Sequence, residues 1–211
     1  MKTLLMSSVA ALAMMAAAPA VAEEGFSNPE AGDIMVRVRG LGVIPNEDAD
    51  LSVAGGDVKI DNSYVPELDF TYFFTSNIAA ELILATAPHD VSGSGALSGA
   101  DLGEVWLLPP TLTLQYHFTD LGRFKPYLGA GVNYTIFYNE DAGDFSDIDY
   151  DNGFGFALQA GVDYQVADRW YINADVKRLW LNTDVSVNNG AVTGDVDINP
   201  WIFGVGVGYR F

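Results

Sequence analysis

The last eleven residues constrain the fold of this chain more than any other segment. Every second residue from Trp201 to Phe211 is large and apolar, and those between are glycine except Ile202 and Arg210. Successive side chains of a β-strand point to opposite faces. Such a strand suits an outer-membrane β-barrel, with one face toward lipid and the other toward a narrow lumen. We expect Tyr209 and Phe211 to form an assembly signal that the barrel assembly machinery of the outer membrane reads.

The N-terminal residues predict export. Lys2 precedes an apolar run over residues 4–18, and the A-x-A pattern at 20–22 is typical of a signal-peptide cleavage site. An uncleaved membrane anchor is the alternative, but the run falls short of the roughly 20 residues that a spanning helix needs. The sequence therefore predicts a cleaved signal peptide over residues 1–22 and a single domain over residues 23–211.

Composition excludes several classes of function. The chain has no cysteine, so disulfide bonds and thiolate metal sites are excluded. Its formal net charge is −18, and it lacks the basic face that phosphate contacts require, so we expect no nucleic-acid partner. We also expect no cofactor.

Alternation of apolar and polar residues divides the mature chain into eight segments. The predicted strands cover residues 33–43, 65–74, 78–88, 104–118, 124–138, 153–166, 170–181 and 196–211. Three short turns alternate with four long polar connections, at 45–64, 89–103, 139–152 and 182–195. This rhythm predicts an all-β fold, an eight-stranded antiparallel transmembrane β-barrel of the outer-membrane type, with short periplasmic turns and long extracellular loops. A soluble sandwich or lipocalin-like barrel also alternates, but rarely repeats this rhythm of lengths.

Several stretches resemble the OmpW family of small outer-membrane proteins. They are DFTYFFTSNI (69–78), LPPTL (108–112), PYLGAGVNY (126–134), GVDY (161–164), NPW (199–201) and GYRF (208–211). The resemblance implies an eight-stranded barrel in the outer membrane of a Gram-negative bacterium. It also implies a porin-like role in the passive passage of small hydrophobic molecules, and links to stress adaptation and to service as a surface receptor.

If the large apolar face meets lipid, charged residues of the strands face the lumen. Lysine or arginine turned to lipid at mid-membrane would cost about 2–4 kcal/mol. Eight strands leave room for little more than side chains, so we expect these residues to form a structural network of charges. Its predicted members are Arg37, Arg39, Glu67, Asp69, Glu81, Lys125, Asp163, Asp175, Lys177 and Arg210. Lys177 departs from a purely apolar conduit and is expected to pair with Asp175 or Glu81.

Nearer the long connections the inward positions are less polar. The predicted apolar lining consists of Leu41, Val43, Ile83, Ala85, Leu107, Pro109, Phe137 and Leu179. A hydrophobic solute entering from outside would meet the charged floor and leave sideways between strands. Proline removes a backbone donor, so Pro88, Pro109 and Pro110 mark a predicted gap in the wall; alternatively, these prolines only end strands.

One long connection is rich in carboxylates. Residues 139–152 include Asp144, Asp147, Asp149 and Asp151 and no basic residue. Such residues are a weak candidate for Ca²⁺ binding, or for sharing divalent ions with lipopolysaccharide. Their order does not match an EF-hand, so we expect a solvated loop and no metal site.

An enzyme is the least favoured class. His89 and His117 are the two histidines, and no nucleophile, base and orienting acid come together around them. The predicted partners are therefore outer-membrane lipid and lipopolysaccharide, the assembly machinery and small hydrophobic solutes. The alternative function is a structural or receptor protein with acidic surface loops and a closed barrel.

Overall fold

The computed structural model describes residues 26–53 and 55–211, and its regular elements are β-strands. Their bounds are β1 Ile34–Ile44, β2 Asp48–Leu51, β3 Gly56–Ile60, β4 Ser63–Phe73, β5 Ile78–Ala85, β6 Ala87–Gly95, β7 Asp101–Leu108, β8 Thr111–His117, β9 Phe124–Tyr138, β10 Ile148–Tyr150, β11 Gly153–Gln165, β12 Trp170–Trp180, β13 Asn182–Val187, β14 Val192–Asp197 and β15 Trp201–Arg210. None of the described residues belongs to a helix long and apolar enough to cross a membrane. The predicted signal peptide lies outside the described residues.

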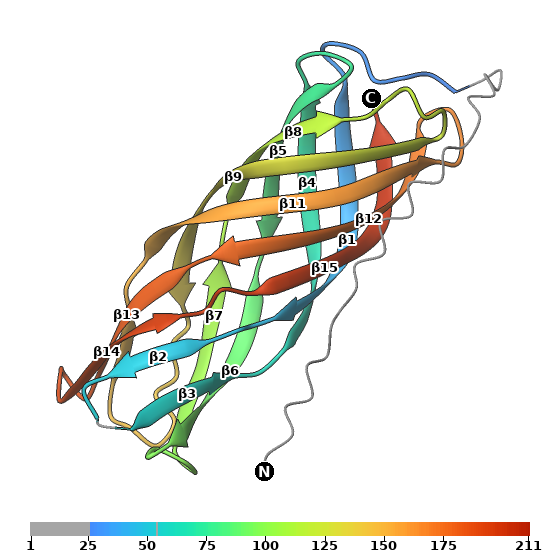
Figure 1. The fold of residues 1–211 in the computed structure, drawn as a ribbon. Coiled ribbons are helices and arrows are strands. Elements are labelled where there is room, and N and C mark those ends of the chain that lie inside the picture. Colours follow the sequence, from blue (N-terminus) through green and yellow to red (C-terminus); the bar gives the residue numbers. More distant parts are fainter. Residues whose placement is uncertain (1–25, 54) are drawn as a thin grey trace, which may run out of the picture.

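Eight of these strands close into a ring. Their order is β11-β12-β15-β1-β4-β5-β8-β9, and β9 pairs back with β11 (Figure 1). The first and last strands of the chain meet in an antiparallel ladder from Met35↔Arg210 to Ile44↔Trp201. The predicted eight-stranded antiparallel barrel is confirmed.

The wall of the ring alternates as a membrane barrel requires. In β4, Glu67 and Asp69 are buried in the lumen, whereas Leu68 and Phe70 face outward and are exposed. Outward-facing aromatic residues gather at both ends of the ring, a placement favoured at membrane–water interfaces. At the turn end they include Phe74, Phe118 and Trp170, and at the opposite, loop end Trp180 and Trp201.

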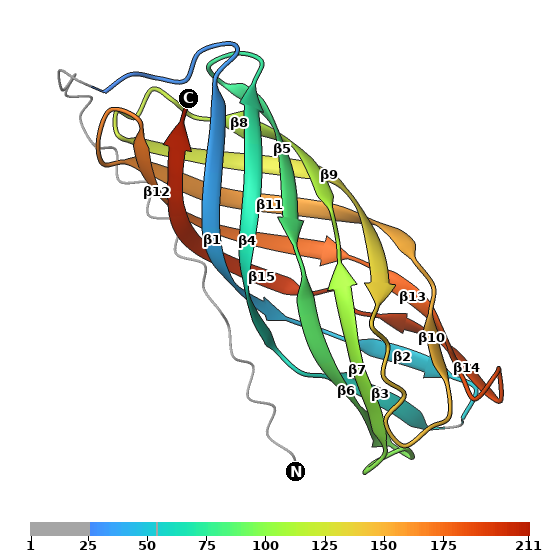
Figure 2. The ribbon, with the colours of Figure 1, turned by 180° about the vertical axis from the view of Figure 1, so that it is seen from behind.

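The four long connections at the loop end carry strands of their own. They contain β2, β3, β10, β13, β14 and most of β6, which extend the barrel beyond the outer aromatic residues (Figures 1 and 2). These strands form because their apolar residues also alternate: in β13, Val185 and Val187 are buried while Asp184 is exposed. Their inward residues pack into the largest apolar cluster of the described chain, which includes Val58, Leu102 and Ile198.

Candidate functional site

The lower lumen is filled by eight charged side chains, which we call the ion network. Its members are Arg37, Arg39, Lys177, Glu67, Asp69, Glu81, Asp163 and Asp175, all buried. Arg37 and Arg39 lie directly opposite Asp69 and Glu67 in the β1–β4 ladder, so strand register alone brings opposite charges together. Cross-strand neighbours at this spacing interact directly.

Arg37 and Arg39 connect opposite sides of the barrel. The Nη2 of Arg37 lies 2.8 Å from Oδ2 of Asp163, and its Nε donates to Oδ1 of the same carboxylate at 3.1 Å. The Nη2 of Arg39 lies 3.0 Å from both Asp69 Oδ2 and Glu81 Oε1. Such bidentate and shared contacts combine geometric specificity with strength, so the network holds the lumen in one arrangement.

Glycines of β15 make room for the two arginines. Gly208 lies opposite Arg37, and Gly206 lies opposite Arg39. A Cβ added at Gly206 would come within 2.1 Å of the Val38 carbonyl oxygen and 2.7 Å of the Arg39 Cα, so this position admits no side chain without backbone movement. The small face of the C-terminal strand is therefore what lets the arginine side chains cross the lumen.

Above the ion network lies a first apolar cavity, the lower cavity, with a volume of about 50 Å³. Leu41, Val43, Ile83 and Leu179 line its sides, and Lys177 reaches its floor. The Nζ of Lys177 is 3.1 Å from Glu67 Oε2 and 3.2 Å from Asp175 Oδ1, so its charge is already paired.

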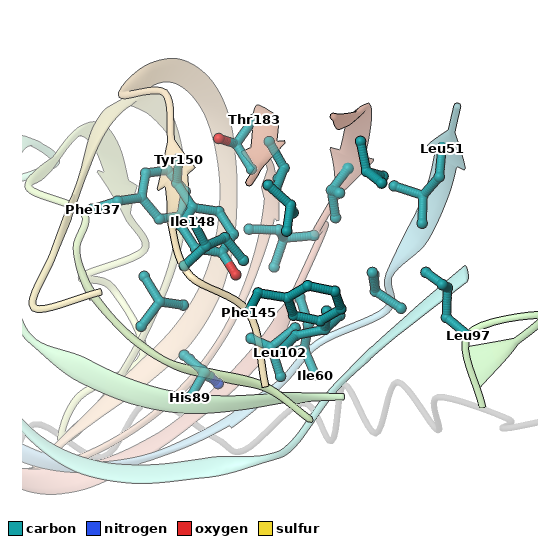
Figure 3. A pocket seen from close by; sticks show the side chains of 18 of the residues that line it. Leu51, Ile60, His89, Leu97, Leu102, Phe137, Phe145, Ile148, Tyr150 and Thr183 are labelled. Carbon is teal, nitrogen blue, oxygen red and sulfur yellow. The ribbon is translucent and has the colours of Figure 1, made fainter. Parts of the chain in front are cut away.

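A second apolar cavity, the upper chamber, lies inside the loop-end extension and has a volume of about 60 Å³. On this measure one water molecule needs about 10–15 Å³. Figure 3 shows the side chains around it, including Leu102, Phe145 and Ile148, converging from several strands and connections. The chamber thus offers an apolar volume to a small solute outside the lipid-facing ring.

The two cavities are neighbours at a level that we call the waist, where His89, Leu107 and Ile198 line both of them. His89 lies at the loop-end side of the Pro88–Trp106 pair, beyond the outer aromatic residues. Its Nδ1 is 2.9 Å from the Asp61 carbonyl oxygen. Burial lowers the pKa of its imidazole below the ordinary value, so the ring is neutral near pH 7.

The wall beside the lower cavity is interrupted. Pairing of β5 with β8 ends at Ile83↔Thr111, and pairing of β6 with β7 begins at Ala87↔Leu107. The described ladders contain no pair between residues 84–86 and 108–110 across this seam. Ala85 and Pro109, within the interruption, and Ala87 at its edge also line the lower cavity.

A second interruption lies on the other side of the same strand. Pairing of β4 with β5 ends at Glu67↔Ala85. Pairing resumes where the Asp61 N–H donates to the Asp90 carbonyl at 3.0 Å, next to the Ile60↔Val91 pair of β3 and β6. Pro66 and Pro88 lie within the interval. Pro66 was not among the prolines predicted to mark a gap, although a proline within a strand is itself a signal of a missing backbone donor.

Lys125 and Arg210 lie outside the ion network, at the turn end. Lys125 Nζ donates to Asn28 Oδ1 at 2.6 Å, and Arg210 Nη1 donates to the Ser27 carbonyl at 3.2 Å. The guanidinium of Arg123 stacks over the Phe26 ring at 3.9 Å. Because β9 and β15 lie on different sides of the ring, these contacts hold the segment before β1 across the turn end.

The remaining predicted side chains have simple surroundings. His117 stacks on Tyr127 and lies at a tilt against Phe73, and its Nε2 lies 2.9 Å from Gln115 Oε1. Asp149 and Asp151 are exposed at the loop end, and the described residues contain no group of three or more acidic or histidine side chains placed to hold a metal ion.

The upper chamber is the part of the site that was not predicted from the sequence. Phe137 lines it, but most of its other walls come from stretches interpreted as polar connections. The signal was present in short alternating runs such as DVSV (184–187), and it recurs in DVDI (195–198), where the last predicted strand begins. In both runs the valine or isoleucine is buried and the aspartate is more exposed.

Comparisons with known proteins agree with this architecture. The sequence profile of the OmpW family matches residues 30–211. An uncharacterised outer-membrane protein of Sinorhizobium fredii, y4mB, is 51% identical over 83% of this chain and 79% of its own length. A Pseudomonas aeruginosa protein, PahQ, named for a dibenzothiophene metabolism operon, is 32% identical over 75% of this chain and 77% of its own. The crystal structure of the outer-membrane protein OprG from Pseudomonas aeruginosa superposes with a TM-score of 0.81 at 32% identity, covering 88% of this chain and 99% of that one.

Proposed function

This chain belongs to the OmpW family of outer-membrane β-barrel proteins, and we propose that it lets small hydrophobic molecules pass from the cell exterior into the outer membrane. One observation carries the proposal: two apolar cavities are neighbours at the waist above a closed ion network, next to an interrupted wall. A solute would enter the upper chamber, cross the waist to the lower cavity and leave sideways near Ala85 and Pro109.

The ion network gives the physical reason for a sideways exit. Its buried side chains close the lumen below the lower cavity, and moving an apolar solute through them would break several buried ion pairs. Breaking a buried pair costs several kcal/mol. Lipid beside the wall interruption is the more favourable destination for an apolar molecule.

The name of one relative fits the same chemistry. PahQ is named for an operon of dibenzothiophene metabolism, and dibenzothiophene is a small, apolar, aromatic molecule. We therefore propose aromatic or aliphatic hydrocarbons and their simple derivatives as the solute class. We also propose that lipopolysaccharide lies next to the barrel. We propose as well that the assembly machinery recognises Tyr209 and Phe211.

The test is a charge placed at the waist. Leu107→Arg should reduce the initial uptake of a fluorescent hydrophobic tracer into proteoliposomes by at least about tenfold, since a tenfold effect needs only ~1.4 kcal/mol. Ile83→Arg, in the lower cavity, should act in the same direction. The matched control is Thr193→Arg, which adds the same charge at an exposed position of β14.

Folding of each variant is checked by the heat-dependent gel shift of an intact barrel. Unchanged uptake by folded Leu107→Arg protein would overturn the transport proposal and favour a barrel that only presents its extracellular surface.

A further inference from the structure

His89 carries an unused hydrogen-bonding atom at the waist. Its Nδ1 contacts the Asp61 carbonyl oxygen at 2.9 Å. A carbonyl oxygen accepts and cannot donate, so Nδ1 carries the hydrogen. In the neutral imidazole Nε2 is then a bare acceptor, and within the described part of the chain it has no hydrogen-bond partner.

The surroundings of this acceptor are apolar. The residues that share the waist with His89 are Leu107 and Ile198, and Val105 lies opposite it in the β6–β7 ladder. An acceptor without a partner in apolar surroundings is unfavourable. A solute that brings a hydrogen-bond donor to the waist supplies that partner, whereas a pure hydrocarbon does not.

We infer that His89 is a specificity-determining residue that favours hydrophobic solutes carrying one hydroxyl group, such as phenols and alcohols, by accepting their O–H at Nε2. The inference rests on the proposed function, since it assumes that the cavities admit apolar solutes. It adds the chemical class that the waist prefers among them.

Tyr150 is the competing polar group of the upper chamber. Its ring stacks on Phe137 with centroids 5.5 Å apart, and Figure 3 shows its hydroxyl pointing into the ring of apolar side chains. No other described residue hydrogen-bonds this hydroxyl. A hydroxyl can donate as well as accept, so Tyr150 would also hold an ether, which the Nε2 of neutral His89 cannot.

Three probes of similar size separate these possibilities: fluorobenzene, para-fluorophenol and para-fluoroanisole. Their binding to the full mature barrel in amphipol is measured by fluorine NMR near pH 7, where His89 is neutral. We expect wild-type protein to bind the phenol about fivefold more tightly than the other two, the ratio expected from a net hydrogen-bond energy of about 1 kcal/mol.

His89→Asn is the decisive variant, because its amide nitrogen preserves a donor for the Asp61 carbonyl while Nε2 is lost, and its amide oxygen takes the place of the ring Cδ2, short of the Nε2 position. The phenol should then lose its advantage, to within about twofold of fluorobenzene. Fluorobenzene reports any change in cavity size, which alters the binding of all three probes together. Tyr150→Phe is the matched control, since it keeps the stacked ring, and the phenol should keep its advantage.

Several results would overturn the inference. These are a phenol advantage that survives in His89→Asn, an advantage lost in Tyr150→Phe, and anisole binding as tight as phenol binding in wild type. If fluorobenzene binds but phenol gains nothing, the inference fails alone. If wild-type protein binds none of the probes, the proposed function fails and this inference with it.

Discussion

The lower and upper halves of this barrel have opposite polarity. In β12 the charged Asp175 and Lys177 face the lumen while Ala174 faces outward, and in β13 Val185 faces the lumen while Asp184 faces outward. Both halves obey the same alternation of strand side chains. The difference shows what each wall meets: hydrocarbon around the ion network and water around the upper chamber.

The inversion also separates two roles. The lower half closes the lumen with buried ion pairs, and the upper half offers an apolar volume with few polar atoms. The outer surface of the upper half is acidic: Asp50, Asp195 and Asp184 lie opposite one another across β2, β14 and β13. Burial and these neighbouring carboxylates raise the pKa of Asp195. A charged exterior keeps the extension in water, although its interior is as apolar as a soluble core.

The largest effect is expected when a cation is removed from the lower half. Arg39→Leu leaves the buried carboxylates of Glu67 and Glu81 with fewer partners. Breaking a buried pair on one side costs about 3–5 kcal/mol. We expect a loss of this size in the free energy of unfolding, measured by urea denaturation in lipid vesicles.

The control for this change is Arg169→Leu, which removes the same side chain from an exposed turn. Surface substitutions usually stay within about 0.5 kcal/mol. If the two variants were equally stable, the ion network would not determine the stability of the lower half.

A smaller effect is expected from the glycine face of β15. Gly206→Ala places a methyl group against the Val38 carbonyl and the Arg39 Cα, both backbone atoms. Overpacking of this kind costs about 1–3 kcal/mol. Gly40→Ala is the matched control, because a Cβ there meets nothing within 4 Å. Equal stability of the two variants in the same denaturation assay would show that the β1–β15 seam is looser than the structure indicates.

Sequence patterns predicted the lower half well for two reasons. Its strands are long, and surrounding lipid requires apolar side chains on the outer face. The alternation in β4 and β9 identified strands, faces and inward charges. It did not distinguish the ion network from Lys125 and Arg210, because their partners Asn28 and Ser27 come from a segment with no periodicity and Asp33, which pairs with Arg210, lies at its end.

The upper half was harder to predict for a physical reason. Its strands are short, and β10 spans only Ile148–Tyr150. Acidic outward residues made the run at 184–187, and the connection up to Asp195, look solvated. Their inward valines can be recognised as lining a cavity only when strands distant in sequence, such as β3, β7 and β13, surround it together. Pairings of that kind depend on register across the whole barrel, which no single run of residues encodes.

The smallest expected effect is a pH dependence confined to the upper half. Burial keeps the pKa of His89 below its ordinary value of about 6.5, so the folded state holds the ring neutral while an unfolded extension takes up a proton. Stability is therefore present above that ordinary pKa and decreases as the pH falls below it. The loss is at most about 1.4 kcal/mol per pH unit.

The charges near His89 limit the effect without reversing it. The Asp90 carboxylate favours the protonated ring, the Asp61 carboxylate is paired with Lys59 at 2.7 Å, and the opposing β7 residue is the uncharged Val105. Between pH 6.5 and 5, amide hydrogen exchange of β6 residues such as Val91 should therefore quicken while that of β1 stays constant, after correction for intrinsic exchange. His89→Asn should remove this difference, because it removes the group that titrates in this range. A pH dependence that persists in His89→Asn would show that His89 is not the titrating group. A pH dependence that spreads equally to β1 would show that the two halves unfold as one unit despite their opposite polarity.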